Sequence, residues 1–372
     1  MSLFLYSLQV KRGFLLKIAQ VCPRYFPYIG GVETNVKEIS ERLVLENHDV
    51  EVITTDPSGK LKKKDTINGV KVTRFKSFAP GEAYYFAPQI CIYLMNRSYD
   101  VIHVHSYHAL PAFFAALSER NKRFVFSPHY HRGGHTPLRN LLHKPYKLFG
   151  KMIFSRADAI ICVSEYEKGL VESDFNVKEK TITIPNGLNL SEFENLKRQK
   201  NENKEKILLY VGRLEEYKGV QYIIQSLPEL QDFRLRIVGK GPYKDELYSI
   251  AERIGVAERI EWLKDISRRE LLECYADADI FLMLSSHEAY GITVAEALAS
   301  GTLCMVVKGS ALEEFVDGIN CIGIEWPPTK EKIIKMLQGM EKVKKQTNSG
   351  KKKGLIDWND VVDKIGEIYV KK

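Results

Sequence analysis

Residues 280–301, IFLMLSSHEAYGITVAEALASG, contain one strand–loop–helix unit that decides the fold class. The apolar run at its start is typical of a strand buried on both faces, as strands of parallel sheets are. Gly291 permits a sharp turn, and residues 292–299 have the apolar spacing of a short helix. Glu288 lies in the loop and Glu296 in the helix, so two carboxylates flank the helix start. This arrangement is compatible with a solvated face, a metal pair or a site for a polar ligand.

The same alternation of apolar strands and amphipathic helices runs through the chain of 372 residues. The predicted strands are 15–21, 50–55, 70–75, 101–105, 123–127, 159–164 and 181–185 in the first half, and 207–212, 234–239, 259–263, 280–285 and 303–307 in the second. Continuous apolar strands that alternate with helices predict α/β domains whose parallel sheets are covered on both faces. A chain of this length fits two such domains.

Changes in composition along the chain predict the domain boundaries. Residues 1–190 and residues 207–350 are predicted to form the two α/β domains. Residues 191–206 are polar and poorly periodic, as expected of a linker between them. Residues 1–13 are interpreted as an extension ahead of the first strand, and residues 351–372 are predicted to include a C-terminal helix.

Composition also restricts the cellular location. The six cysteines are scattered and form no C-x-x-C pair, which is typical of free thiols in a reducing compartment. No apolar run reaches the ~18–20 residues needed to span a bilayer. The predicted location is therefore cytoplasmic, with a peripheral position on the inner face of the cell membrane as a further possibility.

The positive charge of the chain is unevenly distributed. Residues 1–190 contain 26 Lys and Arg against 17 Asp and Glu, whereas residues 191–372 contain 29 against 30. The excess in the first half fits an anionic partner, meaning a membrane surface, a phosphorylated lipid or a nucleic acid. A solvated lysine-rich surface is the alternative.

Polar residues follow several predicted strands, at the positions where ligands of open α/β sheets bind. Gly30 and Gly31 precede a helix and either present backbone amides to an anion or form a plain turn. His129 opens a histidine-rich loop that matches no helical zinc pattern, so a polar ligand site is favoured. Arg213 and Lys218 put two cations at a helix start, which is typical of diphosphate binding unless both are simply exposed.

Phosphate-binding fingerprints of other enzyme classes are absent from the sequence. Gly239-Lys240-Gly241-Pro242 does not match G-x-G-x-x-G, and no G-x-x-x-x-G-K-[ST] loop occurs, which disfavours the corresponding hydride-transfer enzymes and ATPases. The amides of Gly291, Ile292 and Thr293 begin the helix of residues 292–299 and would be free to meet a phosphate. Because carboxylates accept hydrogen bonds from hydroxyls, the two glutamates beside this helix start suit a sugar-rich, phosphorylated ligand.

In this order and spacing, the motifs resemble those of the retaining glycosyltransferases of the GT-B fold, in particular the family 4 group. They are the Gly30-Gly31 loop, His129, Ile184-Pro185-Asn186-Gly187, V-G-R-L with Lys218-Gly219, V-G-K-G-P, E-A-Y-G-I-T-V-A-E and a C-terminal helix with Trp358. The resemblance covers nearly the whole chain and implies two Rossmann-like α/β/α domains with parallel sheets facing a central cleft. Residues 1–190 would bind the acceptor, residues 207–350 would bind the nucleotide-sugar donor, and the helix within 351–372 would pack back on the N-terminal domain.

The resemblance also implies a role for each candidate residue. Arg213 and Lys218 would neutralise the donor diphosphate. Glu288 would contact the transferred sugar, Glu296 would hold the ribose hydroxyls, and His129 would face the reacting sugar. The implied catalytic residues are His129, Arg213, Lys218 and Glu288, and the implied donor-binding residues are Gly30, Gly31, Arg213, Lys218, Gly239, Glu288, Gly291, Ile292, Thr293 and Glu296. No metal is expected because the family needs none, and no cofactor is expected because the nucleoside diphosphate sugar is a substrate.

The predicted activity is that of a retaining, metal-independent hexosyltransferase. It would move a sugar from a UDP- or GDP-linked donor to an acceptor hydroxyl in glycolipid, polysaccharide or glycan biosynthesis. One alternative is a nucleotide-sugar epimerase of the same fold, which needs no acceptor. A non-enzymatic nucleic-acid-binding protein is the alternative from another class, but no stacking motif or helix-turn-helix pattern occurs, so no nucleic-acid partner is expected.

Residues 131–156 form a basic amphipathic stretch. Its cations are Arg132, Arg139, Lys144, Lys147, Lys151 and Arg156, and it contains no acidic residue. Such a stretch is typical of a segment that lies on an anionic membrane, which would suit a lipid-linked acceptor, with a sugar acceptor as the alternative. The alternative is a helix that packs by its apolar face and leaves its lysines in water.

Overall fold

The computed structural model describes residues 15–82, 84–118, 122–132, 137–194, 196, 205–340 and 354–371. For Glu82 and for residues 137–145 it describes the backbone alone. The predicted extension of residues 1–13 and residues 197–204 of the predicted linker therefore lie outside the described residues.

The chain divides into two compact units. Unit 1 contains residues 1–187 and 358–372, and unit 2 contains residues 188–357. The C-terminal helix α12 (Trp358–Val370) belongs to unit 1 and packs against α2 (Gly31–Leu45). Unit 1 is thus completed by chain from both ends of the sequence.

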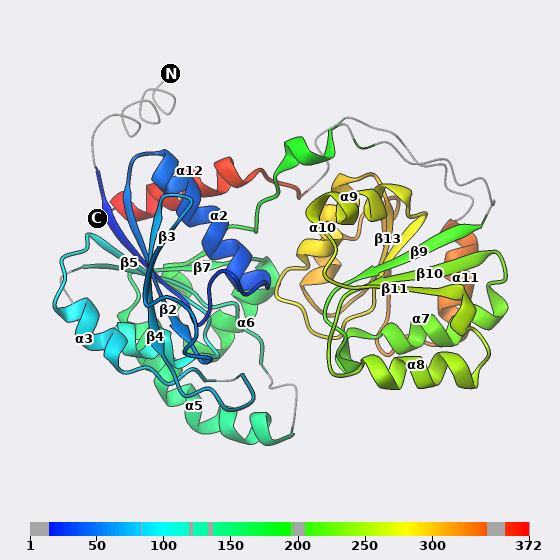
Figure 1. The fold of residues 1–372 in the computed structure, drawn as a ribbon, viewed down its shortest axis with the longest axis horizontal. Helices are drawn as coiled ribbons and strands as arrows, with labels where there is room; N and C mark the ends of the chain where they lie inside the picture. Colours follow the sequence, from blue (N-terminus) through cyan, green and yellow to red (C-terminus); the bar gives the residue numbers. More distant parts are fainter. Residues whose placement is uncertain are drawn as a thin grey trace. The chain divides into compact units, whose positions relative to one another are not determined.

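Unit 1 is built on one eight-stranded sheet with the order β3-β4-β2-β1-β5-β6-β7-β8 (Figure 1). Its strands are β1 (Lys17–Val21), β2 (Asp49–Asp56), β3 (Lys64–Ile67), β4 (Val70–Lys76), β5 (Val101–His105), β6 (Arg123–Ser127), β7 (Ala159–Cys162) and β8 (Thr181–Thr183). The central strand β1 pairs in parallel on both sides, so that Ile18 lies opposite Val50 of β2 and Val101 of β5. All other pairings in this sheet are parallel except that of β3 with β4.

The hairpin of β3 and β4 departs from the predicted all-parallel arrangement. β3 runs antiparallel to β4, with Ile67 opposite Val70. Asn68 and Gly69 form the turn, and both have positive φ, as a two-residue hairpin turn requires. The sequence prediction missed β3 because Lys64-Asp65-Thr66-Ile67 lacks the apolar run of a strand buried on both faces.

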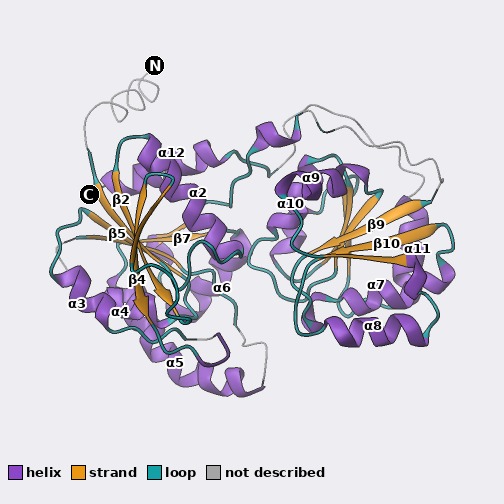
Figure 2. Cartoon of the chain, in the orientation of Figure 1, coloured by secondary structure: helices purple, strands orange, loops and turns teal. Residues whose placement is uncertain are grey.

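Helices cover both faces of the unit 1 sheet (Figure 2). α2 and α12 lie on one face. The other face carries α3 (Gln89–Met95), α4 (Leu110–Ala116), α5 (Pro137–Arg156) and α6 (Glu165–Phe175). α4 packs between α3 and α5, so these three helices form one continuous layer.

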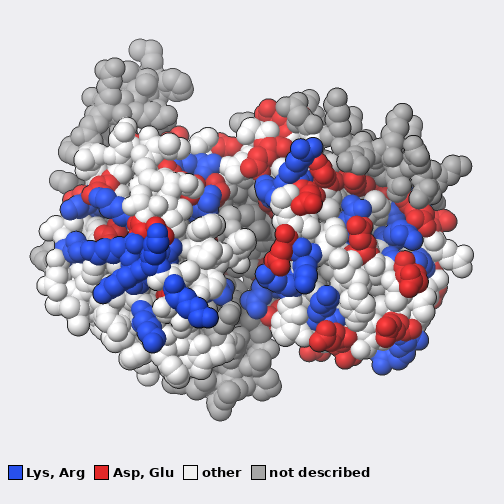
Figure 3. Space-filling view, in the orientation of Figure 1, with Lys and Arg blue, Asp and Glu red and all other residues white. Residues whose placement is uncertain are grey.

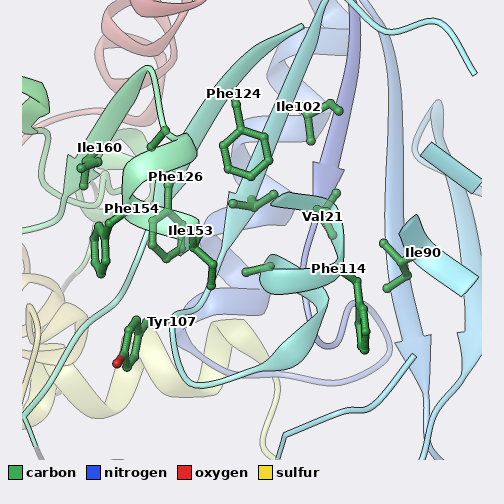
Figure 4. Packing of buried hydrophobic residues seen from close by; sticks show 14 of the residues in the cluster. Val21, Ile90, Ile102, Tyr107, Phe114, Phe124, Phe126, Ile153, Phe154 and Ile160 are labelled. Carbon is green, nitrogen blue, oxygen red and sulfur yellow. The ribbon is translucent and has the colours of Figure 1, made fainter. Parts of the chain in front are cut away.

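A buried hydrophobic cluster of unit 1 lies between this helix layer and the sheet. Ile90 of α3 and Phe114 of α4 contribute to it together with Ile102 of β5 and Phe126 of β6 (Figure 4). Full burial of such side chains stabilises by about 1.5–3 kcal/mol each, so the cluster fixes the layer on the sheet. The opposite faces of the same strands remain available to α2 and α12, since side chains alternate along a strand.

Unit 2 contains a six-stranded, fully parallel sheet with the order β11-β10-β9-β12-β13-β14. Its strands are β9 (Lys206–Val211), β10 (Phe233–Val238), β11 (Ile260–Leu263), β12 (Ile280–Met283), β13 (Leu303–Val307) and β14 (Cys321–Ile324). Its helices are α7 (Val220–Ser226), α8 (Lys244–Arg253), α9 (Arg268–Asp277), α10 (Ile292–Ala299) and α11 (Lys330–Met340). α7 and α8 lie on one face and α9 and α10 on the other (Figure 2).

Short 3₁₀ helices complete several connections. They are η1 (Pro80–Glu82), η2 (Lys178–Lys180), η3 (Leu190–Phe193), η4 (Glu216–Lys218), η5 (Leu227–Glu229), η6 (Ala257–Arg259) and η7 (Ala311–Phe315). In unit 2 the strand order reverses between β9 and β12, and ligands of open α/β sheets bind at the carboxyl ends of strands at such a switch point. The residues after these two strands are therefore the first to consider as a site.

Candidate functional site

Lys218 and Glu288 form an ion pair at the switch point of unit 2. Lys218 ends η4 after β9, and Glu288 lies in the loop after β12. Both side chains are largely buried, and the Lys218 ammonium donates to a carboxylate oxygen of Glu288. Burial acts to lower the pKa of Lys218, but the charge of Glu288, its hydrogen bond and Tyr217 together raise that pKa above its ordinary value. Lys218 therefore stays charged although it is withdrawn from water.

Gly219 allows the two loops to meet. It has a φ of 75°, in the left-handed region, and a Cβ atom there would lie 2.2 Å from the carbonyl oxygen of Leu284. The Ser286 amide also donates to the Tyr217 carbonyl at 3.0 Å, which ties the loop after β12 to η4. A glycine directly after Lys218 is thus required for the close approach that forms the ion pair.

Arg213 follows β9 in the same loop but lies farther out. Its side chain is 67% exposed, and its Nη2 atom lies 2.9 Å from Glu215 Oε1. The buried Tyr210 donates its hydroxyl hydrogen to the Arg213 carbonyl at 2.7 Å. The backbone of Arg213 is therefore fixed while its guanidinium remains at the surface, where it is accessible to an anionic ligand.

Gly239 has a packing role that is independent of any ligand. Its φ is 156°, and a Cβ atom would lie 1.9 Å from the carbonyl oxygen of Gly212. The loops that follow β9 and β10 thus touch at this point. The predicted role of Gly239 in donor binding stays a prediction.

The helix α10 begins beside Glu288. Gly291 is its N-cap residue, with a φ of 102°, and its carbonyl accepts from the amides of Val294 and Ala295 at 3.0 and 3.2 Å. The amides of Ile292 and Thr293 precede the first residue that has an acceptor within the helix. They form a short N-terminal array of donors four and five residues after Glu288, in the position where an anion binds favourably.

Glu296 is held on the second turn of α10 by two residues of α9. Arg268 Nη1 donates to one of its carboxylate oxygens at 2.5 Å and the Tyr275 hydroxyl to the other at 2.9 Å. Arg268 also pairs with Glu192 at 2.8 Å. Burial acts to lower the pKa of Arg268, but Glu296 and Glu192 raise it.

Sequence reasoning missed Arg268, Tyr275 and Glu192 as neighbours of Glu296. Ser267 and Glu270 form a capping box at the start of α9, a signal that the sequence carries three residues apart. That signal predicts the helix start and places Arg268 in its first turn, but it does not reveal that α9 packs against α10.

In unit 1, Gly30 and Gly31 lie at the start of α2, after β1. Gly30 is the extended N-cap residue, and a Cβ atom there would lie 2.4 Å from a carboxylate oxygen of Glu33. Glu33 is buried in the first turn and pairs with Arg24 Nε at 2.9 Å. Arg24 and Glu33 are not among the site residues predicted from the sequence, although an acid in the first turn of a helix is favourable for the helix dipole.

His129 follows β6 and has a positive φ of 46°. Its Nε2 atom is enclosed and has no hydrogen-bond partner among the described residues. Burial lowers the pKa of His129 to about 4, so the ring is neutral near pH 7. The ring stacks on that of His105, with 6.1 Å between centroids.

His129 lies at the end of a buried polar chain that reaches the C-terminal helix. His103 Nδ1 lies 2.7 Å from the Tyr369 hydroxyl of α12, and His105 Nε2 lies 2.7 Å from Gln20 Oε1. The amide nitrogen of Gln20 donates to the Tyr369 hydroxyl at 3.0 Å. Since His103 and His105 alternate with Ile102 and Val104 along β5, they face α12 while the aliphatic residues face the main core.

Two family matches cover most of the chain. Residues 29–192 match Glycosyltransferase Family 4, and residues 192–353 match Glycosyl transferases group 1. The chain is also 30% identical over 327 residues to an uncharacterised glycosyltransferase of Methanocaldococcus jannaschii, covering 81% of this chain and 83% of that protein. The chain belongs to the GT-B glycosyltransferases of the family 4, group 1 type.

Other relatives of this glycosyltransferase carry more specific names. It is 26% identical to alpha-monoglucosyldiacylglycerol synthase of Streptococcus pneumoniae, over 77% of this chain and 70% of that protein. It is also 26% identical to GDP-mannose:cellobiosyl-diphosphopolyprenol alpha-mannosyltransferase of Komagataeibacter xylinus, over 78% and 75%.

Solved structures confirm the predicted GT-B fold. Sucrose-phosphate synthase of Thermosynechococcus elongatus has a TM-score of 0.78 at 16% identity, covering 95% of this chain and 98% of that chain. Anabaena HepE in complex with UDP-glucose has a TM-score of 0.75 at 16% identity, covering 94% and 98%.

The described part of the glycosyltransferase bears on two further expectations. Its described residues contain no group of three or more His, Cys, Asp or Glu side chains placed to hold a metal ion. Within the same ranges, no helix combines the length and the apolar content needed to cross a bilayer.

The basic stretch of residues 131–156 is only partly described. Residues 133–136 and the side chains of 137–145, including Arg139 and Lys144, lie outside the described residues. Although the stretch contains no acid, Arg132 lies 3.1 Å from Asp174 and Arg156 lies 3.7 Å from Asp158. These two cations are therefore partnered by carboxylates from other parts of the sequence.

Proposed function

We propose that this glycosyltransferase moves a hexosyl group from a UDP- or GDP-linked sugar to a hydroxyl of a lipid-linked acceptor, with retention of the anomeric configuration. The names of two relatives support a lipid acceptor, because one contains diacylglycerol and the other diphosphopolyprenol. The second name also contains GDP-mannose, and a solved neighbour holds UDP-glucose, which together support a nucleoside diphosphate sugar as the donor.

The single observation that carries the proposal is the Lys218–Glu288 ion pair beside the start of α10. A diphosphate that meets the amides of Ile292 and Thr293 would lie against the positive end of the helix. Lys218 pairs with Glu288, which precedes the start of α10, and the ammonium stays charged although it is buried. Preorganised charges of this kind act most strongly in sites that exclude water.

The proposed reaction breaks the bond between the anomeric carbon and the donor diphosphate. The acceptor hydroxyl forms the new bond on the same face of the sugar, and its proton passes to an oxygen of the leaving phosphate. Lys218 and Arg213 stabilise the negative charge that develops on the diphosphate. Glu288 is already bound to Lys218, which favours a role in binding sugar hydroxyls over attack on the anomeric carbon.

We extend the proposal to the absence of a metal and of a cofactor. Two cations and the helix-start amides of α10 supply the charge that a divalent ion would otherwise neutralise. His129, neutral near pH 7 and with an unpartnered Nε2 atom, is proposed to hydrogen-bond the transferred sugar. Glu296 is proposed to hold the ribose hydroxyls, and Gly30 and Gly31 to lie near the phosphate and the acceptor.

The proposal is tested with purified protein, UDP- and GDP-sugars, and polyprenyl-phosphate-linked or diacylglycerol-linked acceptors in detergent. We expect transfer in the presence of EDTA and a product whose anomeric proton coupling in NMR matches that of the donor. Inversion of the configuration would contradict the mechanism. A second arm contains donor alone, and the appearance of an epimer there would favour the epimerase instead.

Replacing Arg213 by alanine should slow transfer by about a hundredfold, by analogy with the loss of one preorganised donor. The matched control is Arg234→Ala, because Arg234 is also an exposed arginine of unit 2 with a carboxylate partner, Glu205. Steady-state kinetics measure kcat/KM for transfer in both variants. Near wild-type kcat/KM in Arg213→Ala would remove Arg213 from the mechanism.

Replacing Glu296 by glutamine should raise KM for the donor about tenfold with little change in kcat, because a hydrogen bond to a charged acceptor contributes about 1.5–3 kcal/mol. Glu192→Gln is the control, since it removes the other carboxylate that Arg268 contacts. A loss confined to kcat in Glu296→Gln would contradict the assignment to ribose binding.

A further inference from the structure

Helix α3 presents apolar side chains to solvent. Ile90 and Leu94 point into the core of unit 1, whereas Ile92 is 63% and Met95 57% exposed. Ile92 and Met95 are three positions apart and so lie on the same side of the helix. This outward face contributes nothing to the core of unit 1.

The segment before α3 extends the same surface. Phe78 and Phe86 pair with each other through two backbone hydrogen bonds of 3.1 and 2.9 Å, and Phe78 is 72% exposed. Lys76 and Phe78 are both exposed while Ser77 between them is buried, so their side chains point the same way. The Phe78 ring and the Lys76 ammonium are thus exposed on the same side of this segment.

Ring contacts link Phe86 to the core of the helix layer, and α5 in the same layer carries further exposed apolar side chains. The ring of Phe86 packs edge-on against Phe114 of α4 at 5.3 Å, and Phe113 packs against Phe149 of α5 at 4.7 Å. On α5, Leu148 is 67% exposed and Met152 is also exposed. Exposed apolar groups that are contiguous over several elements mark an interaction surface more often than scattered ones do.

Cations lie beside this surface. Residues 59–76 contain seven Lys and Arg and one Asp, and Figure 3 shows Lys and Arg gathered over β2, β3 and β4. A hollow of about 780 Å³ is lined by Lys63, Lys76 and Arg97 together with the apolar Ile92. The basic and apolar parts of the surface therefore meet in one place.

The hollow contains a buried cation that is held by the protein itself. Arg74 lines it and is almost fully buried, pairs with Asp65 at 3.4 Å, and donates to the carbonyls of Lys62 and Phe26 at 3.1 and 2.9 Å. Asp56 lines it as well, but its carboxylate already accepts from the amides of Ser58 and Leu61 at 3.0 and 2.9 Å. The cations of the hollow that are exposed to an anion are thus Lys63, Lys76 and Arg97.

We propose that unit 1 docks on an anionic phospholipid bilayer through this surface, called the docking face and defined by Lys63, Lys76, Phe78, Ile92, Met95 and Arg97. Apolar side chains would enter the headgroup region, and the cations would meet lipid phosphates, one of them in the hollow. A nucleic acid would meet the cations but leave the apolar groups in water, so a bilayer fits both parts better. The inference rests on the proposed function in that a lipid-linked acceptor resides in such a bilayer.

The docking face differs from the basic stretch singled out in the sequence. Its cations come from the β3–β4 hairpin and from the residue pair that follows α3, none of which lies within residues 131–156. Leu148 and Met152 of that stretch join it only at its α5 end. Sequence reasoning did not find the docking face because its parts are up to 34 positions apart in the chain.

The test is sedimentation of the full chain with vesicles, without any sugar nucleotide. Vesicles of phosphatidylcholine are compared with vesicles in which about a third of the lipid is phosphatidylglycerol, at low and at physiological salt. We expect binding to the anionic vesicles only, and weaker binding at higher salt. Equal binding to both kinds of vesicle, or no binding to either, would overturn the proposal.

The charged part is tested with the double variant Lys63→Gln/Lys76→Gln. Its vesicle affinity should fall about 30-fold, since each lysine near an anionic surface contributes about 1 kcal/mol. The matched control is Lys332→Gln/Lys335→Gln, which removes the same charge from the exposed side of α11 in unit 2. Equal losses of vesicle affinity in both double variants would mean that net charge alone drives binding, which would contradict docking through this face.

The apolar part is tested with Ile92→Ser/Met95→Ser. We expect a loss of about tenfold or more that persists at physiological salt, because it removes apolar area from the bilayer contact. All variants are checked by thermal unfolding, which should change little because these side chains are exposed. Retained affinity with an unchanged unfolding midpoint would contradict an apolar contribution.

Failure of this inference is distinguishable from failure of the proposed function. Transfer to a detergent-solubilised acceptor is measured on the same variants and should be unchanged, since no residue of the docking face belongs to the donor site. Normal transfer without vesicle binding would reject the docking face alone. Vesicle binding without transfer would reject the proposed reaction and leave the docking face in place.

Discussion

Replacing Lys218 by methionine should lower kcat/KM for transfer by about a thousandfold, the upper range for the loss of one preorganised charge. The ammonium is the buried cation of the site and is kept charged by Glu288. The substitution retains the apolar length of the side chain and removes its charge. Steady-state kinetics with the donor and acceptor of the wild-type reaction measure the effect.

The same substitution should also destabilise the protein, because Glu288 is left buried without its partner. Removal of one member of a buried ion pair costs about 3–5 kcal/mol. The double variant Lys218→Met/Glu288→Gln removes both charges and should recover much of that loss in a denaturant titration. Transfer should not recover with it.

This separation decides whether Lys218 acts in catalysis or only in folding. If the double variant regained transfer together with stability, the role of Lys218 would be structural. The single variant Glu288→Gln completes a double-mutant cycle with the two variants above. It should lower turnover more than donor affinity if Glu288 contacts the transferred sugar. Non-additive effects of the two substitutions are expected because the residues are in direct contact.

The fold could be predicted because its signals are local. Most parallel strands of the core are continuous apolar runs followed by a helix, as β12 and α10 are within residues 280–301. β3 and β14 were missed for opposite reasons. β3 is a polar edge strand whose best signal is its Asn68-Gly69 turn, whereas β14 is short and contains Gly323.

The residues of the candidate site could be predicted from the sequence, but the ion pairs that they form could not. Lys218 and Glu288 were each found because they follow a strand. That they would form an ion pair depends on β9 and β12 being neighbours in the sheet, a fact that only the tertiary order contains. Arg268 and Glu296 are the same case, since the packing of α9 on α10 joins them. The roles assigned to these residues in the reaction stay predictions.

The histidines of unit 1 show a different limit of sequence reasoning. His103 and His105 belong to a strand predicted as a buried apolar run, yet both are buried polar side chains. His103 contacts Tyr369, 266 positions away in the sequence, and Ser127 of β6, whereas His105 contacts Gln20 of β1. No local sequence signal predicts that Tyr369 of α12 would supply the hydroxyl that hydrogen-bonds to His103.

Stability should fall steeply as the pH is lowered from about 6.5 toward 4. Burial lowers the pKa of His103 to about 3 and that of His129 to about 4, and it lowers that of His105 as well. Between these values and the unfolded pKa of ~6.5, the unfolded chain binds protons that the folded chain does not, so folding is favoured at the higher pH. Stability from these histidines is thus present above pH 6.5 and lost below it.

One buried carboxyl acts in the opposite direction. Burial raises the pKa of Glu167 to about 7, although it accepts from the amides of Tyr130 and Val163. Between about pH 4.5 and 7 the folded state therefore holds a proton that the unfolded state has released, which favours folding at lower pH. Near pH 5.5, unfolding lets the three histidines take up about one proton each, whereas Glu167 releases about one. The net uptake of about two protons gives the free energy of unfolding a slope of about 2–3 kcal/mol per pH unit.

His129→Asn should remove about one of these protons, so the slope of unfolding free energy against pH should fall by about 1.4 kcal/mol per unit near pH 5.5. Asparagine suits this position because it tolerates the positive φ of His129 better than other residues do. Denaturant titrations from pH 5 to 7 measure the slope for the variant and for the wild-type protein. An unchanged slope in His129→Asn would mean that the His129 ring already exchanges protons with solvent in the folded protein, and its proposed neutrality in the site would then be lost below pH 6.5 as well.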